Sequence, residues 1–438
     1  MTDAQIVKPV AISGFPEWLP GVRAVEQAWL GRIRATFERY GFCSVETPSV
    51  ESLDVLAAKG ETSQEVYALR RLQSEPGDDS GRLGLHFDLT VPTARYVAAH
   101  FNELTFPFRR YQIQRVWRGE RPQEGRYREF TQCDIDVINV DSVPLYFDAE
   151  LPRIVHEVLT DLGVPAWTLN VNNRKLLQGF YEGLGVADPV AVIRAADKLD
   201  KIGPDGVGKL LVDQVGLTEA QAKSVLDLAA IKADGSAAVL AAVGGLGVKS
   251  DLLAEGLDEL AFVLDELVDL PAGSVVADLS IARGLDYYTG TIYEAKFVEW
   301  PGFGSICSGG RYDDLAGSFI RRNLPGVGIS IGFTRIFAKL VAEGLITPGP
   351  ASPADVLVVI PSDERRRSAV ATAAALRGRG LKVETYHQAD KVGKQIRYAS
   401  RKGIGAVWFP PFEDGKPHEV KNLATGDQTE ADPDTWTP

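Results

Sequence analysis

The stretch RVWRGERPQEGRYREFTQCDID, residues 115–136, predicts a strand, an arginine-rich loop and a returning strand. The residues just before it alternate as in a strand, and the segment REFTQCDIDVINV reads as a second strand. Two strands joined by a short loop pair in antiparallel fashion. We therefore expect a hairpin whose loop carries Arg118, Arg121 and Arg126 and whose returning strand carries Gln132 and Asp136.

This hairpin is locally basic, with seven arginines against two glutamates from Arg109 to Arg128, although the net charge of the chain is −12. Guanidinium groups are always charged and match phosphate oxygens, so the loop could hold a polyphosphate. Gln132 and Asp136 have even spacing, so they share one face of the strand with Asp134, and these two residues could recognise a polar ligand. A basic surface hairpin with solvated charges explains the pattern equally well.

A second candidate site is HFDLTVPTARY, residues 86–96. Asp88 and Thr90 are two residues apart, which would place them on one face of an extended segment, where they could bind an ammonium group. The alternative is turn chemistry before Pro92, which in isolation explains the same residues.

Three further segments contain residues suited to a pocket. SIARGLDYYTGTIYE, residues 280–294, clusters Arg283, Asp286, Tyr287 and Tyr288 beside glycines, although aromatic packing in a twisted strand is the alternative. SGGRYDDLAG, residues 308–317, has two glycines, which allow close approach of a ligand, ahead of Tyr312. GVGISIGFTRIF, residues 326–337, predicts a strand that runs into a helix bearing Arg335, which alone is more often a surface residue.

The remaining sequence indicates several structural units. Apolar spacing predicts a helix over residues 24–40, and Ala, Leu, Lys and Asp dominate a helical insertion at about 187–270. SVVADLSIARGLDYYTGTIYEAKF, residues 274–297, predicts another hairpin. A Pro/Gly/Ala-rich linker covers 346–354, and alternating strands and helices from 355 to 438 predict a small α/β domain with a parallel-type sheet. Eleven Lys/Arg against five Asp/Glu between Asp355 and Phe412 make that domain locally basic.

Composition excludes several classes of protein. With 438 residues and 45% hydrophobic side chains, the chain suits two or three soluble domains. No stretch approaches the roughly 20 apolar residues of a membrane span, and the N-terminus lacks a signal pattern, so we expect a cytoplasmic protein. Three scattered cysteines and five scattered histidines predict neither a disulfide framework nor a protein metal site. The sequence contains no GxxxxGK[ST], HExxH, HIGH or KMSKS string.

Taken in order, these segments resemble class II aminoacyl-tRNA synthetases, and specifically the histidyl-tRNA synthetase family. GFPEWLPGVRAVE and YGFCSVETPSVES, with Pro48, look like class II motif 1, WRGERPQEGRYREF like motif 2, and GVGISIGFTRIF like motif 3. RGLDYYTG and SGGRYDDL resemble the two histidine-specific peptides, and GKQIRYASRKGIGAVW is similar to the anticodon-binding domain. The fold this implies is an antiparallel catalytic sheet flanked by helices over residues 1–345, with the helical insertion, and a three-layer α/β anticodon-binding domain over 355–438.

The resemblance implies ATP-dependent ligation of L-histidine to histidine tRNA through a histidyl-adenylate. Catalysis would rest on Arg283, Arg118 and Gln132. Other roles follow for residues that would bind histidine (Asp88, Thr90, Gln132, Asp136, Tyr287, Tyr288, Tyr312), ATP (Arg118, Glu120, Arg126, Arg335) and tRNA (Arg121, Gln123). The resemblance further implies Mg²⁺ bound with ATP, and a homodimer built on motif 1.

Two features leave alternatives open. Many bacterial members have Glu where this chain has Asp88 and Asp136, so the contacts to the substrate differ by about one methylene. A non-catalytic relative, the regulatory subunit of ATP phosphoribosyltransferase, shares the fold but lacks the C-terminal domain and often loses catalytic arginines. Prolyl, threonyl and glycyl enzymes share a similar anticodon domain but should lack RGLDYY.

Overall fold

The computed structural model describes residues 7–57, 65–73, 82–282, 288–314, 316–413 and 415–438. They form two compact units: Leu30–Leu340, together with the segment that ends at Pro16, and Val341–Pro438, together with Glu17–Trp29. Helix α1 (Pro20–Arg39) therefore contributes residues to both units. No helix in the described part of the chain has the length and apolar character needed to cross a membrane.

A nine-stranded sheet forms the centre of the first unit. Its pairs are antiparallel except β1–β5 and β7–β9, which are parallel. The strands, in spatial order, are β1 (Cys43–Ser44), β5 (Phe108–Trp117), β6 (Glu129–Ile138), β12 (Gly326–Ile331), β11 (Ser305–Tyr312), β10 (Thr291–Phe297), β7 (Trp167–Asn173), β9 (Val275–Asp278) and β8 (Lys232–Ala233). A separate small sheet contains β2 (Val50–Ser52), β4 (Leu83–Leu85) and β3 (Ala68–Leu69), with α2 (Leu53–Leu56) beside it.

The predicted arginine-rich hairpin is confirmed, with β5 and β6 antiparallel and Trp117 opposite Glu129 where the loop begins. The predicted strand–helix unit is also present, as β12 followed by α11 (Phe333–Ala342). The predicted hairpin over residues 274–297 is wrong, because β7 lies between β9 and β10 and pairs with both. Local alternation predicts that strands exist, but their neighbours are set by contacts distant in sequence.

The two faces of the main sheet carry different helices. Helix α4 (Tyr146–Asp161) covers one face, where Oη of Tyr293 donates to the carbonyl of Asp148 at 2.7 Å and Arg311 pairs with the Asp148 carboxylate. Successive side chains of a strand point to opposite faces. Tyr312 accordingly packs in a cluster on the other face with Ala94 of α3 (Thr90–Ala99).

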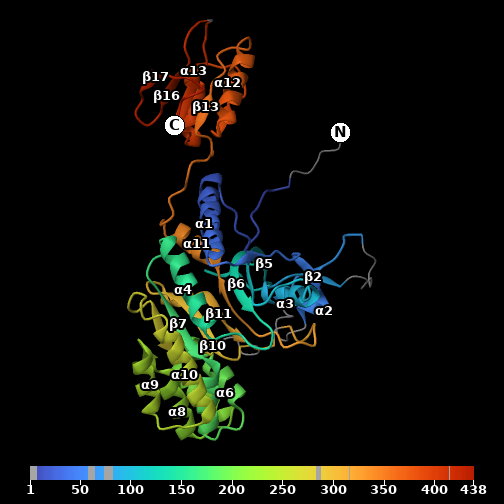
Figure 1. Ribbon diagram of the computed structural model, residues 1–438, viewed down its shortest axis with the longest axis vertical. Coiled ribbons are helices and arrows are strands. Elements are labelled where there is room, and N and C mark those ends of the chain that lie inside the picture. Colours follow the sequence, from blue (N-terminus) through green and yellow to red (C-terminus); the bar gives the residue numbers. More distant parts are fainter. Residues whose placement is uncertain (1–6, 58–64, 74–81, 283–287, 315, 414) are drawn as a thin grey trace. The chain divides into compact units, whose positions relative to one another are not determined.

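The predicted helical insertion consists mainly of helices. It comprises α6 (Pro189–Ala196), α7 (Leu199–Asp213), α8 (Glu219–Ala229), α9 (Ser236–Gly244) and α10 (Asp251–Asp265), and it follows α5 (Arg174–Gly183). Several of these helices are grouped together in Figure 1, and α10 packs along α5. Capping residues mark where they begin: Thr218 and Gln221, for example, form a reciprocal capping box at α8.

The second unit is a three-layer α/β arrangement. Its sheet has the order β14 (Val383–Thr385), β13 (Val356–Val358), β15 (Ala406–Phe409), β16 (Glu419–Asn422) and β17 (Gln428–Glu430). The expected parallel pairing holds for the first three strands, whereas β16 and β17 add antiparallel pairs. One apolar cluster joins the sheet to α12 (Arg366–Gly378), and another joins its alternate residues to α13 (Val392–Lys402).

Candidate active site

Two adjoining cavities lie on the first unit. One has a volume of about 210 Å³ and the other about 350 Å³. Arg118, Gln132, Ser308 and Ser330 line both cavities, so these side chains form the boundary between them. The hairpin β5–β6 supplies two of them, and the neighbouring strands β11 and β12 supply the others.

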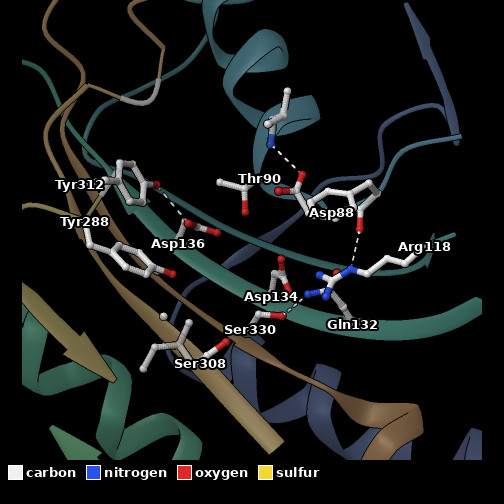
Figure 2. Close-up of a pocket in the computed structure, with 15 residues that line it drawn as sticks. Asp88, Thr90, Arg118, Gln132, Asp134, Asp136, Tyr288, Ser308, Tyr312 and Ser330 are labelled. Atoms are coloured by element: carbon white, nitrogen blue, oxygen red, sulfur yellow. Dashed lines mark hydrogen bonds between the residues drawn. The ribbon is translucent and has the colours of Figure 1, made fainter. Parts of the chain in front are cut away.

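The smaller cavity is acidic, and we call it the acidic cavity. Figure 2 shows Asp134 and Asp136 on one strand, with Asp88 and Thr90 approaching from the start of α3 and two tyrosines from the other side. Oη of Tyr312 donates to Oδ1 of Asp136 at 3.0 Å. The cavity therefore combines three carboxylates with hydroxyl groups and suits a small cationic or hydrogen-bonding ligand.

The spacing of Asp88 and Thr90 predicts an extended segment, but these two residues do not lie on one. Thr90 is the first residue of α3, and Oδ1 of Asp88 accepts a hydrogen bond from the backbone N–H of Val91 at 3.1 Å. This is the turn chemistry of the alternative interpretation. It does not remove the residues from the site, because both side chains still line the acidic cavity.

Arg110, which is not among the residues predicted for the site, lies behind the acidic cavity. It stands opposite Asp136 in the β5–β6 register, and its Nη2 lies 2.5 Å from Oδ2 of Asp136. Arg110 is only 1% exposed, so this is a fully buried ion pair. The available sequence signal was its even spacing with Gln112 and Gln114, which places all three on the face of Asp136.

Burial has the largest effect on the pKa values of the carboxyl groups in the acidic cavity. Removal from water raises the pKa of Asp88, Asp134 and Asp136, because a carboxylate loses its hydration there. For Asp134 the pKa rises to about 7. Arg110 opposes this effect at both strand aspartates, most directly at its ion-pair partner Asp136.

The larger cavity is lined by Arg118, Arg126 and Arg335, and we call it the basic cavity. Arg118 lies between two rings, 4.7 Å from the centre of Phe87 and 5.1 Å from that of Phe130, and its Nε donates to the carbonyl of Phe87 at 3.3 Å. These contacts hold the guanidinium at the boundary between the cavities.

Other contacts order the rim of the basic cavity. Nη1 of Arg126 lies 3.2 Å from Oε2 of Glu120, and Nη2 of Arg335 donates to the carbonyl of Phe303 at 2.5 Å. The guanidinium of Arg335 also lies over the Phe303 ring, 5.1 Å from its centre. Phe303 belongs to the 3-10 turn Pro301–Phe303, which is not among the segments predicted for the site.

Most of the predicted site residues come together, but not all. Asp88, Thr90, Arg118, Gln132, Asp136, Tyr288 and Tyr312 line the acidic cavity, while Glu120, Arg126 and Arg335 line the basic cavity together with Arg118 and Gln132. Arg121 and Gln123 are exposed on the hairpin loop and line neither cavity. Arg283 and Tyr287 lie outside the described residues.

This arrangement suits the joining of two different ligands. A carboxylate held near Arg118 from the acidic side would face a phosphate held by arginines on the basic side. The mostly antiparallel sheet, the hairpin bearing Arg118 and the strand–helix unit bearing Arg335 together define the class II aminoacyl-tRNA synthetases.

Comparison with known proteins identifies the family within that class. The family model for histidyl-tRNA synthetase matches residues 14–336. The chain is 70% identical to the histidine–tRNA ligase of Thermobifida fusca over the whole of both chains, and 48% identical to that of Cutibacterium acnes over 98% of this chain and 96% of the relative. The crystal structure of histidyl-tRNA synthetase from Nostoc sp. PCC 7120 superposes with a TM-score of 0.85 at 36% identity, covering 97% of each chain.

The chain therefore belongs to the histidyl-tRNA synthetase family. It charges histidine tRNA with L-histidine in an ATP-dependent ligation that passes through a histidyl-adenylate. The sequence-based expectation of the fold, the enzyme class and the reaction is thus confirmed.

A glycine on β12 makes room for Asp136, and this leads to a first prediction. A Cβ at Gly328 would lie 2.0 Å from Oδ1 of Asp136, so Gly328→Ala should displace the carboxylate from Tyr312. Weakening this hydrogen bond to a charged group should cost about 1.5 kcal/mol of binding free energy. We therefore expect a roughly tenfold rise in KM for histidine, measured by ATP–pyrophosphate exchange.

The matched control is Gly378→Ala at the end of α12, where an added Cβ meets no atom within 4 Å. Its KM for histidine should equal that of the unmodified enzyme. An unchanged KM in Gly328→Ala would show that Asp136 has room to move without losing its function.

Proposed function

We propose that the acidic cavity binds histidine, that the basic cavity binds ATP, and that the reacting groups meet at Arg118 and Gln132. The observation that carries this proposal is that these two side chains, with Ser308 and Ser330, line both cavities. Substrates in adjoining cavities can react only at the shared boundary. The histidine carboxylate and the α-phosphate are the groups that must meet there.

On the histidine side, Asp88, Thr90 and Gln132 would bind the amino group. Nε2 of Gln132 donates to Oγ of Ser330 at 2.5 Å, while its buried Oε1 has no hydrogen-bond partner within the described residues. An amide oxygen in that state is suited to accept from an ammonium group. Asp136 would receive the imidazole, with Tyr288 and Tyr312 beside it and Tyr287 expected there as well.

On the ATP side, Arg118 would hold the α-phosphate, and Arg126 would meet the outer phosphates. Arg335 would stack on the adenine and hold the γ-phosphate, and Glu120 would contact the adenine side or a metal. Attack of the histidine carboxylate on the α-phosphorus increases the negative charge there, and arginines already in position stabilise it without reorganising. Arg283 is expected at the same phosphate.

Mg²⁺ would accompany ATP in this reaction. Within the described residues, no group of three or more His, Cys, Asp or Glu side chains is arranged to hold a metal alone. Glu65 and Glu120 both line the basic cavity; burial raises the pKa of Glu65, and the charge of Glu120 raises it further. Two such carboxylates, together with phosphates, are the ligands that Mg²⁺ prefers, and the ion would neutralise charge on the leaving phosphates.

The tRNA would contact two regions of the chain. Arg121 and Gln123 lie on the exposed hairpin loop, and Gln123 would lie near the extra 5′ guanosine of histidine tRNA. We assign catalysis to residues 1–345 and anticodon binding to 355–438, where basic residues outnumber acidic ones. We further propose a homodimer built on motif 1 and action in the cytoplasm.

A pair of substitutions tests the division between the two cavities. Asp136→Asn should raise KM for histidine about tenfold or more while KM for ATP changes little, because it removes a charge from the acidic cavity only. Arg335→Ala should show the reverse pattern. Both are measured by ATP–pyrophosphate exchange, and the division fails if both variants impair the same substrate.

A further inference from the structure

Asp134 lies between Gln132 and Asp136 on β6 and lines the acidic cavity, yet none of the roles described so far involves it. It is 3% exposed, and its Oδ1 has no hydrogen-bond partner among the described residues. In Figure 2 its side chain stands above Ser330, within the group of polar residues that surround the cavity. A buried carboxylate oxygen without a donor, on a side chain that lines a cavity, is costly unless a ligand supplies one.

Within the described residues, no positively charged side chain forms an ion pair with Asp134 alone. Arg110 lowers its pKa, but the guanidinium of Arg110 is engaged by Asp136 at 2.5 Å. The carboxylates of Asp88 and Asp136 act in the opposite direction. The thiols of Cys133 and Cys307, the other titratable groups that interact with it, stay neutral because burial raises each thiol pKa well above its ordinary value.

The side-chain hydrogen bond that Asp134 forms within the described part of the chain is with a neutral group. The Ser330 hydroxyl donates to its carboxylate and itself accepts from Nε2 of Gln132. Because the serine has a single proton, this chain of bonds aligns the Gln132 amide and the Asp134 carboxylate at the boundary of the cavity. Both residues then present an acceptor oxygen without a donor.

We propose that Asp134 is a third acidic contact for bound histidine, and that its free oxygen accepts a hydrogen bond from a positively charged group of the substrate. This inference rests on the proposed histidine site. It assigns a further substrate-binding residue beyond Asp88 and Asp136. A substrate analogue without that cation would leave this oxygen buried without a donor, so the contact favours the charged substrate.

Histidine binding would then be coupled to the loss of a proton from Asp134. Burial raises the pKa of Asp134 to about 7, so the carboxyl is partly protonated near neutral pH. A substrate cation beside it favours the ionised form and lowers its pKa. Histidine binding below that pH therefore releases a proton from Asp134 to solvent, and the affinity for histidine falls as the pH decreases.

The test compares Asp134→Asn with the unmodified enzyme over a range of pH, using histidine-dependent ATP–pyrophosphate exchange. We expect the ratio of the two KM values for histidine to be about ten or more near pH 8 and to approach one near pH 6, where the aspartate is itself neutral. Taking the ratio cancels the titration of the free substrate, which is the same for both proteins. The kcat should change little, because the contact is equal in the ground and transition states.

Two controls keep the test decisive. Thermal unfolding of Asp134→Asn and of a second variant, Asp134→Ser, shows whether each variant is folded. The KM comparison can be made with whichever of the two variants folds. Asp88→Asn tests the site itself. If Asp88→Asn raises KM for histidine and Asp134→Asn does not, this inference fails alone; if neither does, the proposed histidine site fails. A KM ratio that is raised equally at every pH shows that Asp134 only supports Ser330 and overturns the proposal.

Discussion

Arg118→Ala should lower kcat for histidine-dependent ATP–pyrophosphate exchange about 10²- to 10³-fold, the usual effect of removing one fixed group that stabilises a developing anion. Arg118 lines both cavities and is held between Phe87 and Phe130 by two ring contacts and a hydrogen bond to the Phe87 carbonyl. Its position is therefore set before the substrates arrive. Alanine removes the charge and leaves the reacting phosphate without this partner.

Arg115→Ala provides the matched control for this variant. Arg115 lies on the same strand, pairs with Glu129 at 2.9 Å and lines neither cavity, and its side chain is 56% exposed. Its exchange rate should match that of the unmodified enzyme. If Arg118→Ala raised KM for ATP but left kcat intact, Arg118 would be a ground-state binding residue and not one that acts on the transition state.

Arg311→Ala should lower the free energy of unfolding by about 3–5 kcal/mol, because it leaves a buried carboxylate without its cation. Nε of Arg311 donates to Oδ1 of Asp148 at 3.0 Å, and its Nη1 donates to the carbonyl of Val143 at 2.9 Å. Asp148 is fully buried. The variant therefore loses an ion pair that fastens β11 to α4, and the loss is measured by chemical denaturation.

The control is Arg321→Ala, which removes an exposed arginine and should change the unfolding free energy by less than about 0.5 kcal/mol. A comparably small change in Arg311→Ala would mean that Asp148 becomes protonated at little cost. In that case the loss of unfolding free energy should become smaller still at lower pH. Burial raises the pKa of Asp148, and its neutral carboxyl group needs no cation.

The sequence predicted the elements of the site better than their positions. Alternation along RVWRGERPQEGRYREFTQCDID was enough to predict the β5–β6 hairpin, because pairing across a short loop is local. The segment from 274 to 297 was misread, because β9 and β10 are separated by a strand that comes a hundred residues earlier in the chain. No local pattern encodes such an insertion.

Adjacent residues that make different contacts also show the limit of prediction from local sequence. Arg311 and Tyr312 follow the same two glycines, yet Arg311 is buried against Asp148 and Tyr312 reaches Asp136. Arg110 was counted only as part of a basic segment, but it forms a fully buried ion pair behind the acidic cavity. Which arginine meets a ligand and which one meets a carboxylate depends on what covers each face of the sheet.

By itself, the sequence determined the class of fold, the family resemblance and the types of residue that the chemistry requires. These depend on local periodicity and on motif order, which one chain carries in full. Only the tertiary structure decided that Arg118 and Gln132 stand between two cavities, that Arg110 pairs with Asp136, and that Asp134 has a raised pKa. Burial, solvation and contact across strands are properties of the assembled sheet, and they arise from residues far apart in the chain.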